Sequence, residues 1–166
     1  MPAVVLPKRI LLIEDDTDVR EALADALRDA GLAVDVAVDG NEAFARLHAQ
    51  PPIDLVITDV YMPVMSGFAL VEKVRAEPRL RNLPIIVISS AGDEERERVS
   101  RLGANFFLQK PVKYQDIVAT VRTLLRAGPQ PGAPMSTRQA PTTEDTRTAV
   151  EFGQERVDPT TRKGRD

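Results

Sequence analysis

The stretch "RILLIEDDTDVREALADALRDAGLAVDVAV", residues 9–38, contains two short apolar runs separated by a helical pattern. Between the runs, apolar residues recur at intervals of three and four, and Gly31 stands where the C-terminal cap of a helix is expected. A strand, a helix and a second strand in this order predict a βαβ unit. The apolar stripe of the helix consists of Val19, Leu23, Ala26, Leu27 and Ala30.

The same alternation continues along most of the chain. The first, third and fourth apolar runs are almost continuously apolar, as strands buried on both faces must be, whereas the second alternates and belongs at an edge. We therefore predict an α/β fold: a doubly wound five-stranded parallel sheet in the order 2-1-3-4-5, which is the flavodoxin-like (βα)5 arrangement. The predicted strands are residues 9–13, 33–38, 55–58, 85–88 and 105–108.

The chain divides into three segments by composition. Residues 1–7 form an N-terminal extension, residues 8–126 carry the alternating pattern, and residues 127–166 are rich in proline, glycine, threonine and mixed charge. A segment with so few large apolar residues cannot bury enough surface to offset its ordering entropy. We therefore expect residues 127–166 to be a disordered tail or a linker.

Composition excludes several classes of protein. A formal net charge of -3 gives no electrostatic reason for direct nucleic-acid binding, which needs a basic face. The absence of cysteine and the single histidine, His48, exclude a disulfide scaffold, a thiol nucleophile and a histidine-rich metal site; His48 is expected at the surface. The N-terminus is too briefly apolar for a signal peptide or a membrane span, so a cytoplasmic protein is expected.

Acidic residues stand where the first and third strands end. In a doubly wound sheet the ligand site lies beyond the carboxyl ends of the strands, at the point where the winding reverses. Glu14, Asp15 and Asp16 follow the first strand, and Asp59 follows the third, so these carboxylates are expected to meet. Two carboxylates about 4 Å apart repel by about 4 kcal/mol at an effective dielectric near 20, which predicts a cation between them. Hard oxygen ligands favour Mg²⁺.

Hydroxyl and ammonium groups are expected at the same edge. The fourth strand leads to Ser89 and Ser90, and the fifth leads to Lys110. Together with a metal ion, these groups would make a site for a phosphoryl group carried on, or passed to, Asp59. Each residue also has a purely structural interpretation, since acids cap helices, serines begin them, and lysines are common on surfaces. The conjunction at one sheet edge favours the functional interpretation.

At this point the sequence resembles the receiver domain of two-component response regulators, the CheY-like superfamily. The resemblance covers roughly residues 8–126 and rests on four motifs that occur in the order and approximate spacing of the family. They are "ILLIEDDTDVR", "LVITDVYMPVMSG", "IIVISSAGD" and "FFLQKP".

The resemblance implies a phosphoacceptor and a magnesium site. Asp59 would attack a phosphohistidine on a partner kinase and form an acyl phosphate. Asp15 would bind Mg²⁺ directly, Glu14 would act through water, and the backbone carbonyl of Tyr61 would complete the protein ligands. Asp16 would then lie outside the metal site, free to cap the first helix.

The resemblance also implies a switch. Ser89 matches the hydroxyl that binds the phosphoryl group, Lys110 matches the lysine that pairs with another phosphoryl oxygen, and Pro111 suggests a cis peptide bond before it. Phe107 matches an aromatic position that is often tyrosine, and phenylalanine offers no phenolic hydroxyl to a partner. Ser90 and Tyr61 are candidates for tuning hydrolysis of the acyl phosphate.

These expectations describe a single-domain response regulator, a signalling protein rather than an enzyme, because its only chemistry would be its own phosphotransfer and autodephosphorylation. The expected partners are a sensor histidine kinase or phosphotransfer protein, a downstream protein target at the face of helix 4, strand 5 and helix 5, and a homodimer through that face. The fourth helical pattern, residues 92–104, has only Val99 and Leu102 as obvious apolar residues, so a loosely anchored helix is predicted there.

Three alternatives remain open. The chain could be a receiver-like interaction module that works without phosphorylation, or the receiver part of a longer regulator whose output domain is missing. A magnesium-dependent aspartyl phosphatase of the haloacid dehalogenase type would need a second aspartate two residues after the nucleophile, where this chain has Tyr61.

Overall fold

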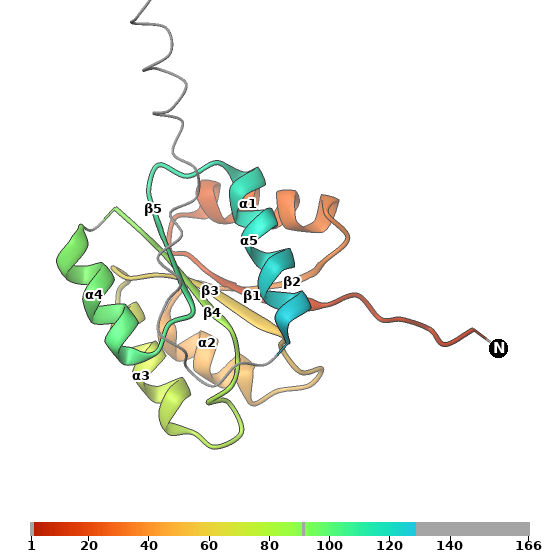
Figure 1. Ribbon diagram of the computed structural model, residues 1–166, viewed down its shortest axis with the longest axis horizontal. Coiled ribbons are helices and arrows are strands. Elements are labelled where there is room, and N and C mark those ends of the chain that lie inside the picture. Colours follow the sequence, from red (N-terminus) through yellow and green to blue (C-terminus); the bar gives the residue numbers. More distant parts are fainter. Residues whose placement is uncertain (1, 91, 129–166) are drawn as a thin grey trace, which may run out of the picture.

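A computed structural model describes residues 2–90 and 92–128, and within them five strands alternate with five helices (Figure 1). All neighbouring strands are parallel and their order is β2-β1-β3-β4-β5, which confirms the predicted fold class. The strands are β1 (Arg9–Ile13), β2 (Ala33–Ala37), β3 (Leu55–Asp59), β4 (Ile85–Ser89) and β5 (Phe106–Gln109). The helices are α1 (Thr17–Asp29), α2 (Gly40–Leu47), α3 (Gly67–Ala76), α4 (Asp93–Leu102) and α5 (Tyr114–Ala127).

Two hydrophobic cores lie on the two faces of the sheet. Alternate residues of a strand point to opposite faces, so β1 contributes Leu11 and Ile13 to one core and Ile10 and Leu12 to the other. The first core packs beneath α2, α3 and α4, and the second beneath α1 and α5. Burial on both faces explains why β1, β3 and β4 are nearly continuously apolar.

The structure confirms β2 as an edge strand and changes the predicted bounds of other strands. β2 is an edge strand with mostly half-exposed residues, as its alternating sequence predicted. β3 and β4 each run one residue further than predicted and end on Asp59 and Ser89. The strand pairing aligns Asp59 with Ile88 and Ser89 with Gln109. Both polar residues therefore have backbones that the sheet holds in place.

Helix α4 is anchored weakly, as its sequence predicted. Val99 is its buried residue, and Gly92 provides no side-chain cap at its N-terminus. Its C-terminal end is held better, because Arg75 of α3 donates from Nε to the carbonyl of Gly103 (2.9 Å) and from Nη2 to Oδ1 of Asn105 (2.7 Å). Burial lowers the pKa of Arg75 to about 10. The N-terminal half of α4 is thus the less constrained half.

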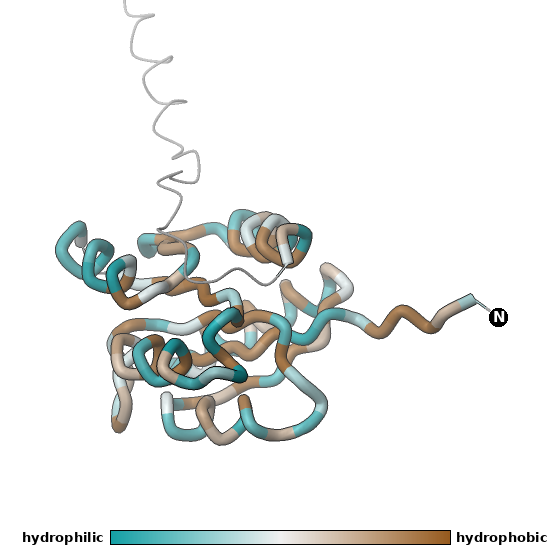
Figure 2. The backbone as a smooth tube through the Cα atoms, turned by 60° about the horizontal axis from the view of Figure 1, so that its bottom comes forward, coloured by the Kyte–Doolittle hydropathy of each residue, from teal (hydrophilic) through white to brown (hydrophobic). Residues whose placement is uncertain are grey.

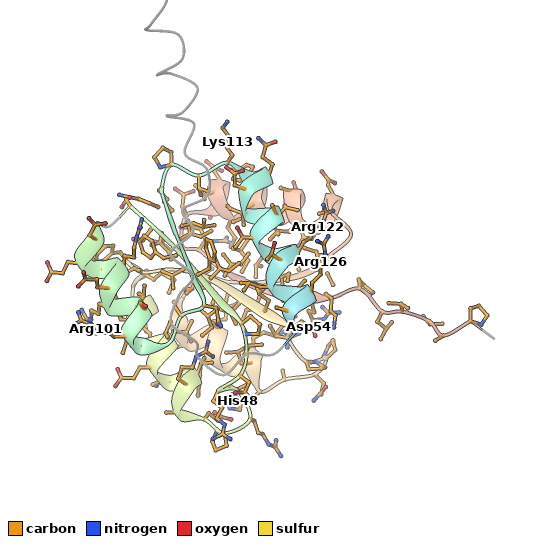
Figure 3. All side chains as sticks on the ribbon, in the orientation of Figure 1. His48, Asp54, Arg101, Lys113, Arg122 and Arg126 are labelled. Atoms are coloured by element: carbon orange, nitrogen blue, oxygen red, sulfur yellow. The ribbon has the colours of Figure 1, made fainter. Side chains whose placement is uncertain are left out.

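His48 lies at the surface, as predicted, and joins α2 to the end of α3 (Figure 3). Its Nδ1 lies 2.8 Å from the carbonyl oxygen of Phe44, and its Nε2 lies 2.7 Å from a carboxylate oxygen of Glu77. Both ring nitrogens face acceptors, so these hydrogen bonds raise the pKa of His48. The ring therefore has a local structural role on the side of the molecule opposite the acidic strand ends.

The structure describes the N-terminal segment from residue 2 and the C-terminal segment only as far as residue 128. In Figure 2 the hydrophobic arm beside the N-terminus projects from the folded part, and Val4, Val5 and Leu6 are highly exposed in it. The predicted disordered tail lies outside the described residues from position 129 onward. No helix in the described ranges has the length and apolar character that crossing a membrane requires.

Candidate functional site

Three of the predicted site residues meet at the carboxyl edge of the sheet. Glu14 follows β1, Asp59 ends β3, and Lys110 follows β5. The ammonium Nζ of Lys110 lies 2.6 Å from Oδ2 of Asp59 and 3.3 Å from Oε2 of Glu14. Residues from three separate strands thus form one ion cluster, with two carboxylates sharing one ammonium group.

The Asp59 side chain is fixed at both of its oxygens. Oδ1 accepts hydrogen bonds from the backbone N–H groups of Val60 (2.6 Å) and Tyr61 (3.2 Å), while Oδ2 faces Lys110. The side chain keeps 11% exposure. A carboxylate that is held in one orientation yet remains accessible is suited to attack an incoming electrophile.

Glu14 is the most buried acid of the cluster, with 6% exposure. Burial raises the pKa of Glu14, while the backbone N–H of Asp16 and the charge of Lys110 oppose this shift. Burial lowers the pKa of Lys110, but the hydrogen bond and charge of Asp59, together with Glu14, outweigh it and the net shift is upward. The two carboxylates therefore stabilise the charged form of Lys110.

The three consecutive acids have separate positions. Asp16 is the N-cap of α1 and accepts a hydrogen bond from the N–H of Val19 (3.0 Å), so the predicted capping role is confirmed. Arg20 donates to the backbone carbonyl of Glu14 (2.8 Å), which fixes the turn between β1 and α1. Asp15, next to Glu14 in the chain, is exposed. Glu14 is thus the member of this acidic run in the ion cluster, and a role of Asp15 in metal binding stays a prediction.

The donor set fits Mg²⁺ by type. The ion cluster of Glu14, Asp59 and Lys110 carries one excess negative charge, and exposed Asp15 adds another. The carboxylate oxygens are the hard ligands that Mg²⁺ prefers. Across residues 2–90 and 92–128, no three side chains of His, Cys, Asp or Glu are grouped so that they could hold a metal by themselves. The carbonyl of Tyr61, water and a phosphoryl oxygen would have to complete the coordination.

The predicted switch residues lie one and two strands away from Asp59, Ser89 on β4 and Phe107 on β5. Ser89 is completely buried at the end of β4, and Ser90 after it is exposed. Phe107 is buried in β5, with the guanidinium carbon of Arg96 5.3 Å from the centre of its ring. The Lys110–Pro111 peptide bond is cis. Ser90 and Pro111 line the same cavity as Glu14, Asp59 and Lys110, whereas Phe107 belongs to the hydrophobic core on the other face of the sheet.

A cavity of about 460 Å³ opens beside the ion cluster. Side chains of β1, α1 and α5 form its mostly aliphatic walls, and Glu14, Asp59 and Lys110 lie at its polar end. The low polarity of these walls strengthens the electrostatic interactions of the cluster relative to those in bulk water.

Two features of the site escaped the sequence analysis. The hydroxyl of Tyr61 donates to Oε1 of Glu95 on α4 (3.0 Å), a contact between elements that no periodicity reveals. Gly67 packs so tightly that a Cβ there would lie 2.2 Å from the carbonyl oxygen of Asp59. The sequence shows a glycine after the turn, but it does not show that Gly67 lies against the backbone of Asp59.

Comparison with known proteins identifies the chain's relatives. Residues 10–122 match the model of the response regulator receiver domain. The response regulator MprA of Mycolicibacterium vanbaalenii is 35% identical over 161 residues, which are 95% of this chain and 63% of MprA. A crystal structure of a response regulator receiver protein from Pseudomonas putida has a TM-score of 0.68 at 36% identity, covering 73% of this chain and 100% of that one.

Some relatives are longer than this chain. The protein ycf29 of Porphyra purpurea is 32% identical over 117 residues, which are 70% of this chain and 56% of ycf29. The chain thus spans less than two thirds of both MprA and ycf29, whereas it covers the whole Pseudomonas putida receiver.

Proposed function

Because this chain belongs to the response regulator receiver domain family, we propose that Asp59 accepts a phosphoryl group from a phosphohistidine. The donor is a sensor histidine kinase or a phosphotransfer protein. The observation that carries the proposal is the position of Asp59 at the end of β3, with one oxygen held by two backbone N–H groups and the other by Lys110.

The chemical step is a displacement at phosphorus. A carboxylate oxygen of Asp59 forms the new P–O bond while the P–N bond to the donor imidazole breaks and its electron pair stays on the nitrogen. Lys110 moves from the carboxylate to a phosphoryl oxygen and balances its charge. Mg²⁺, when bound by Asp15, Asp59, the Tyr61 carbonyl and, through water, Glu14, supplies further charge neutralisation there.

The switch follows from the new charge on Asp59. We propose that Ser89 turns its hydroxyl toward a phosphoryl oxygen and that Phe107 repacks in the space this leaves. Converting a mostly inactive receiver into a mostly active one needs a differential of about 5.5 kcal/mol. Hydrogen bonds to charged groups contribute about 1.5–3 kcal/mol each, so Lys110 and Ser89 supply much of it.

The proposed organisation is a receiver over residues 8–126, with an N-terminal extension and a C-terminal tail or linker. Output then comes from the face of α4, β5 and α5, which binds a downstream protein or a second copy of the chain. We propose that this receiver acts in the cytoplasm without direct binding to nucleic acid, alone or as part of a longer regulator. Action without phosphorylation is the competing assignment.

Magnesium-dependent binding of beryllofluoride, a phosphoryl mimic, tests the proposal. NMR spectra of the wild-type chain should show saturable shifts at Asp59, in α4 and at Phe107 when beryllofluoride and Mg²⁺ are both present. Mg²⁺ alone should shift only resonances around the carboxylates, and beryllofluoride alone should cause no shift, because the mimic needs the metal to neutralise the carboxylates. A wild-type spectrum that stays unchanged under all conditions would favour the phosphorylation-independent module.

Lys110→Ala should weaken both binding of the phosphoryl mimic and the switch that follows it, while leaving Mg²⁺ binding in place. Loss of one charge-assisted bond of about 1.5–3 kcal/mol predicts beryllofluoride affinity lower by about ten- to a hundredfold. Mg²⁺ binding should persist, because Lys110 contributes no metal ligand and its removal leaves the carboxylates. Titrations of beryllofluoride and of Mg²⁺, followed by NMR, measure the two effects.

Lys113→Ala is the matched control, since Lys113 is exposed near the same strand end and forms no side-chain cap on α5 (Figure 3). This control should bind the mimic as the wild type does. Full α4 shifts in Lys110→Ala, at wild-type concentrations of mimic, would contradict the role given to Lys110.

A further inference from the structure

Four side chains join the loop after Asp59 and the start of α3 to α4; we call this group the rim clasp. It consists of Tyr61, Phe68, Glu95 and Arg98. The Tyr61 hydroxyl donates to Oε1 of Glu95 at 3.0 Å, and the guanidinium carbon of Arg98 lies 3.9 Å from the centre of the Phe68 ring. The Tyr61 and Phe68 rings pack edge to face, with centroids 6.5 Å apart. The clasp is thus two adjoining contacts between the same elements.

The clasp holds the N-terminal half of α4 together with one further contact, from Arg96 to the ring of Phe107. That half has no side-chain cap and no buried residue before Val99, whereas the C-terminal end is tied to α3 by Arg75. Glu95 and Arg98 lie on the first two turns of α4, on the side that faces α3. A helix held at one end by a half-buried guanidinium and at the other by more exposed contacts can pivot when the exposed contacts break.

We propose that the rim clasp stabilises the unphosphorylated arrangement of α4 and thereby lowers the affinity of Asp59 for a phosphoryl group. This inference rests on the proposed function. Ser89 is followed after only three residues by α4, so a movement of Ser89 toward Asp59 displaces the N-terminus of that helix. A hydrogen bond of 3.0 Å is lost when its atoms separate by roughly another 0.6 Å, so a small displacement of α4 opens the clasp.

Tyr61 gives the clasp its connection to the site. Its backbone N–H donates to Asp59, and its hydroxyl binds α4. One residue therefore contacts both the phosphoacceptor and the helix that responds to it. By linkage, if phosphorylation opens the clasp, then removing the clasp favours phosphorylation by the same free energy. Glu95 and Arg98 are positioning residues in this scheme, since they touch neither Asp59 nor its ligand.

Beryllofluoride affinity in clasp variants tests the inference. Tyr61→Phe removes the hydroxyl but keeps the ring and the backbone carbonyl, and Arg98→Ala removes the cation above Phe68. Each variant should bind beryllofluoride about two- to tenfold more tightly than the wild type, the range expected for one exposed hydrogen bond or cation–π contact. Amide hydrogen exchange in the first two turns of α4 should be faster in both variants without the mimic.

Matched controls lie on the same helix. Glu97 and Arg101 are exposed on α4, and Figure 3 shows Arg101 directed away from the sheet. Glu97→Ala and Arg101→Ala change the same charges as Glu95→Ala and Arg98→Ala and should leave the affinity at the wild-type value. The double variant Tyr61→Phe/Glu95→Ala should bind no more tightly than the tighter single variant, because both remove the same bond.

The possible results separate the two hypotheses. If the wild type fails to bind beryllofluoride, the proposed function fails. If the wild type binds, and Tyr61→Phe and Arg98→Ala bind equally tightly or more weakly with unchanged α4 exchange, the clasp inference is overturned while the proposed function stands. Tighter binding in the clasp variants alone, and not in the two controls, supports it.

Discussion

Asp59→Asn is expected to abolish phosphoryl acceptance while leaving the fold intact. The amide nitrogen is not a nucleophile, and loss of the attacking group should lower the rate of labelling by at least about a thousandfold. Asparagine nearly preserves the volume, and its Oδ1 can still accept from the N–H groups of Val60 and Tyr61. Intact-mass measurement after incubation with a small-molecule phosphodonor and Mg²⁺ detects the covalent adduct in the wild type and its loss in the variant.

The stability of this variant should change little, because two effects oppose each other. Lys110 loses the closer of its two partners, at 2.6 Å, but Glu14 remains as the second. Removing one of two neighbouring carboxylates also relieves their repulsion. Asp54→Asn is the control; Asp54 lies at the far end of the sheet, where it accepts from the N–H of Arg9, and this variant should be labelled normally. Equal labelling of Asp59→Asn at another residue would refute the assignment of Asp59.

Most of the fold could be predicted from the sequence because the signals are local and repeated. Near-continuous apolar runs mark strands buried on both faces, and the alternating second run marks the edge of the sheet. Once the order of the strands is known, the rule that sites lie at the carboxyl edge brings Glu14, Asp59 and Lys110 together. The ion cluster in the structure has these three members.

What the sequence could not predict depends on side-chain contacts between elements. The hydrogen bonds from Tyr61 to Glu95 and from Arg75 to Gly103 join residues whose spacing in the sequence shows no periodicity. The orientation of Lys110, bonded to two acids at once, also depends on distances that only the assembled sheet sets. Apolar periodicity shows which face of α4 is buried, but not which contacts the charged residues of α4 make with other elements.

Gly67→Ala should cause the largest loss of stability among the variants considered. Gly67 is the first residue of α3, and its N–H donates to the carbonyl of Val60 at 2.8 Å. A Cβ at this position would lie 2.2 Å from the carbonyl oxygen of Asp59 and 2.9 Å from Cα of Val60. These are backbone atoms at the end of a central strand and cannot move aside without displacing Asp59. We expect a loss of about 3 kcal/mol in the free energy of unfolding, at the upper end for overpacking.

Two other glycines provide control variants for the stability of Gly67→Ala. A Cβ at Gly40 would meet the Met65 side chain at 2.7–2.9 Å, and one at Gly92 would meet nothing within 4 Å. Because a methionine side chain yields more easily than a strand backbone, Gly40→Ala should cost about 1 kcal/mol, and Gly92→Ala should stay within about 1 kcal/mol of the wild type. Urea unfolding of the three variants gives the order directly. If Gly67→Ala is as stable as Gly92→Ala, then α3 does not press on the strand end that carries Asp59, and the backbone of the site is less constrained than the structure indicates.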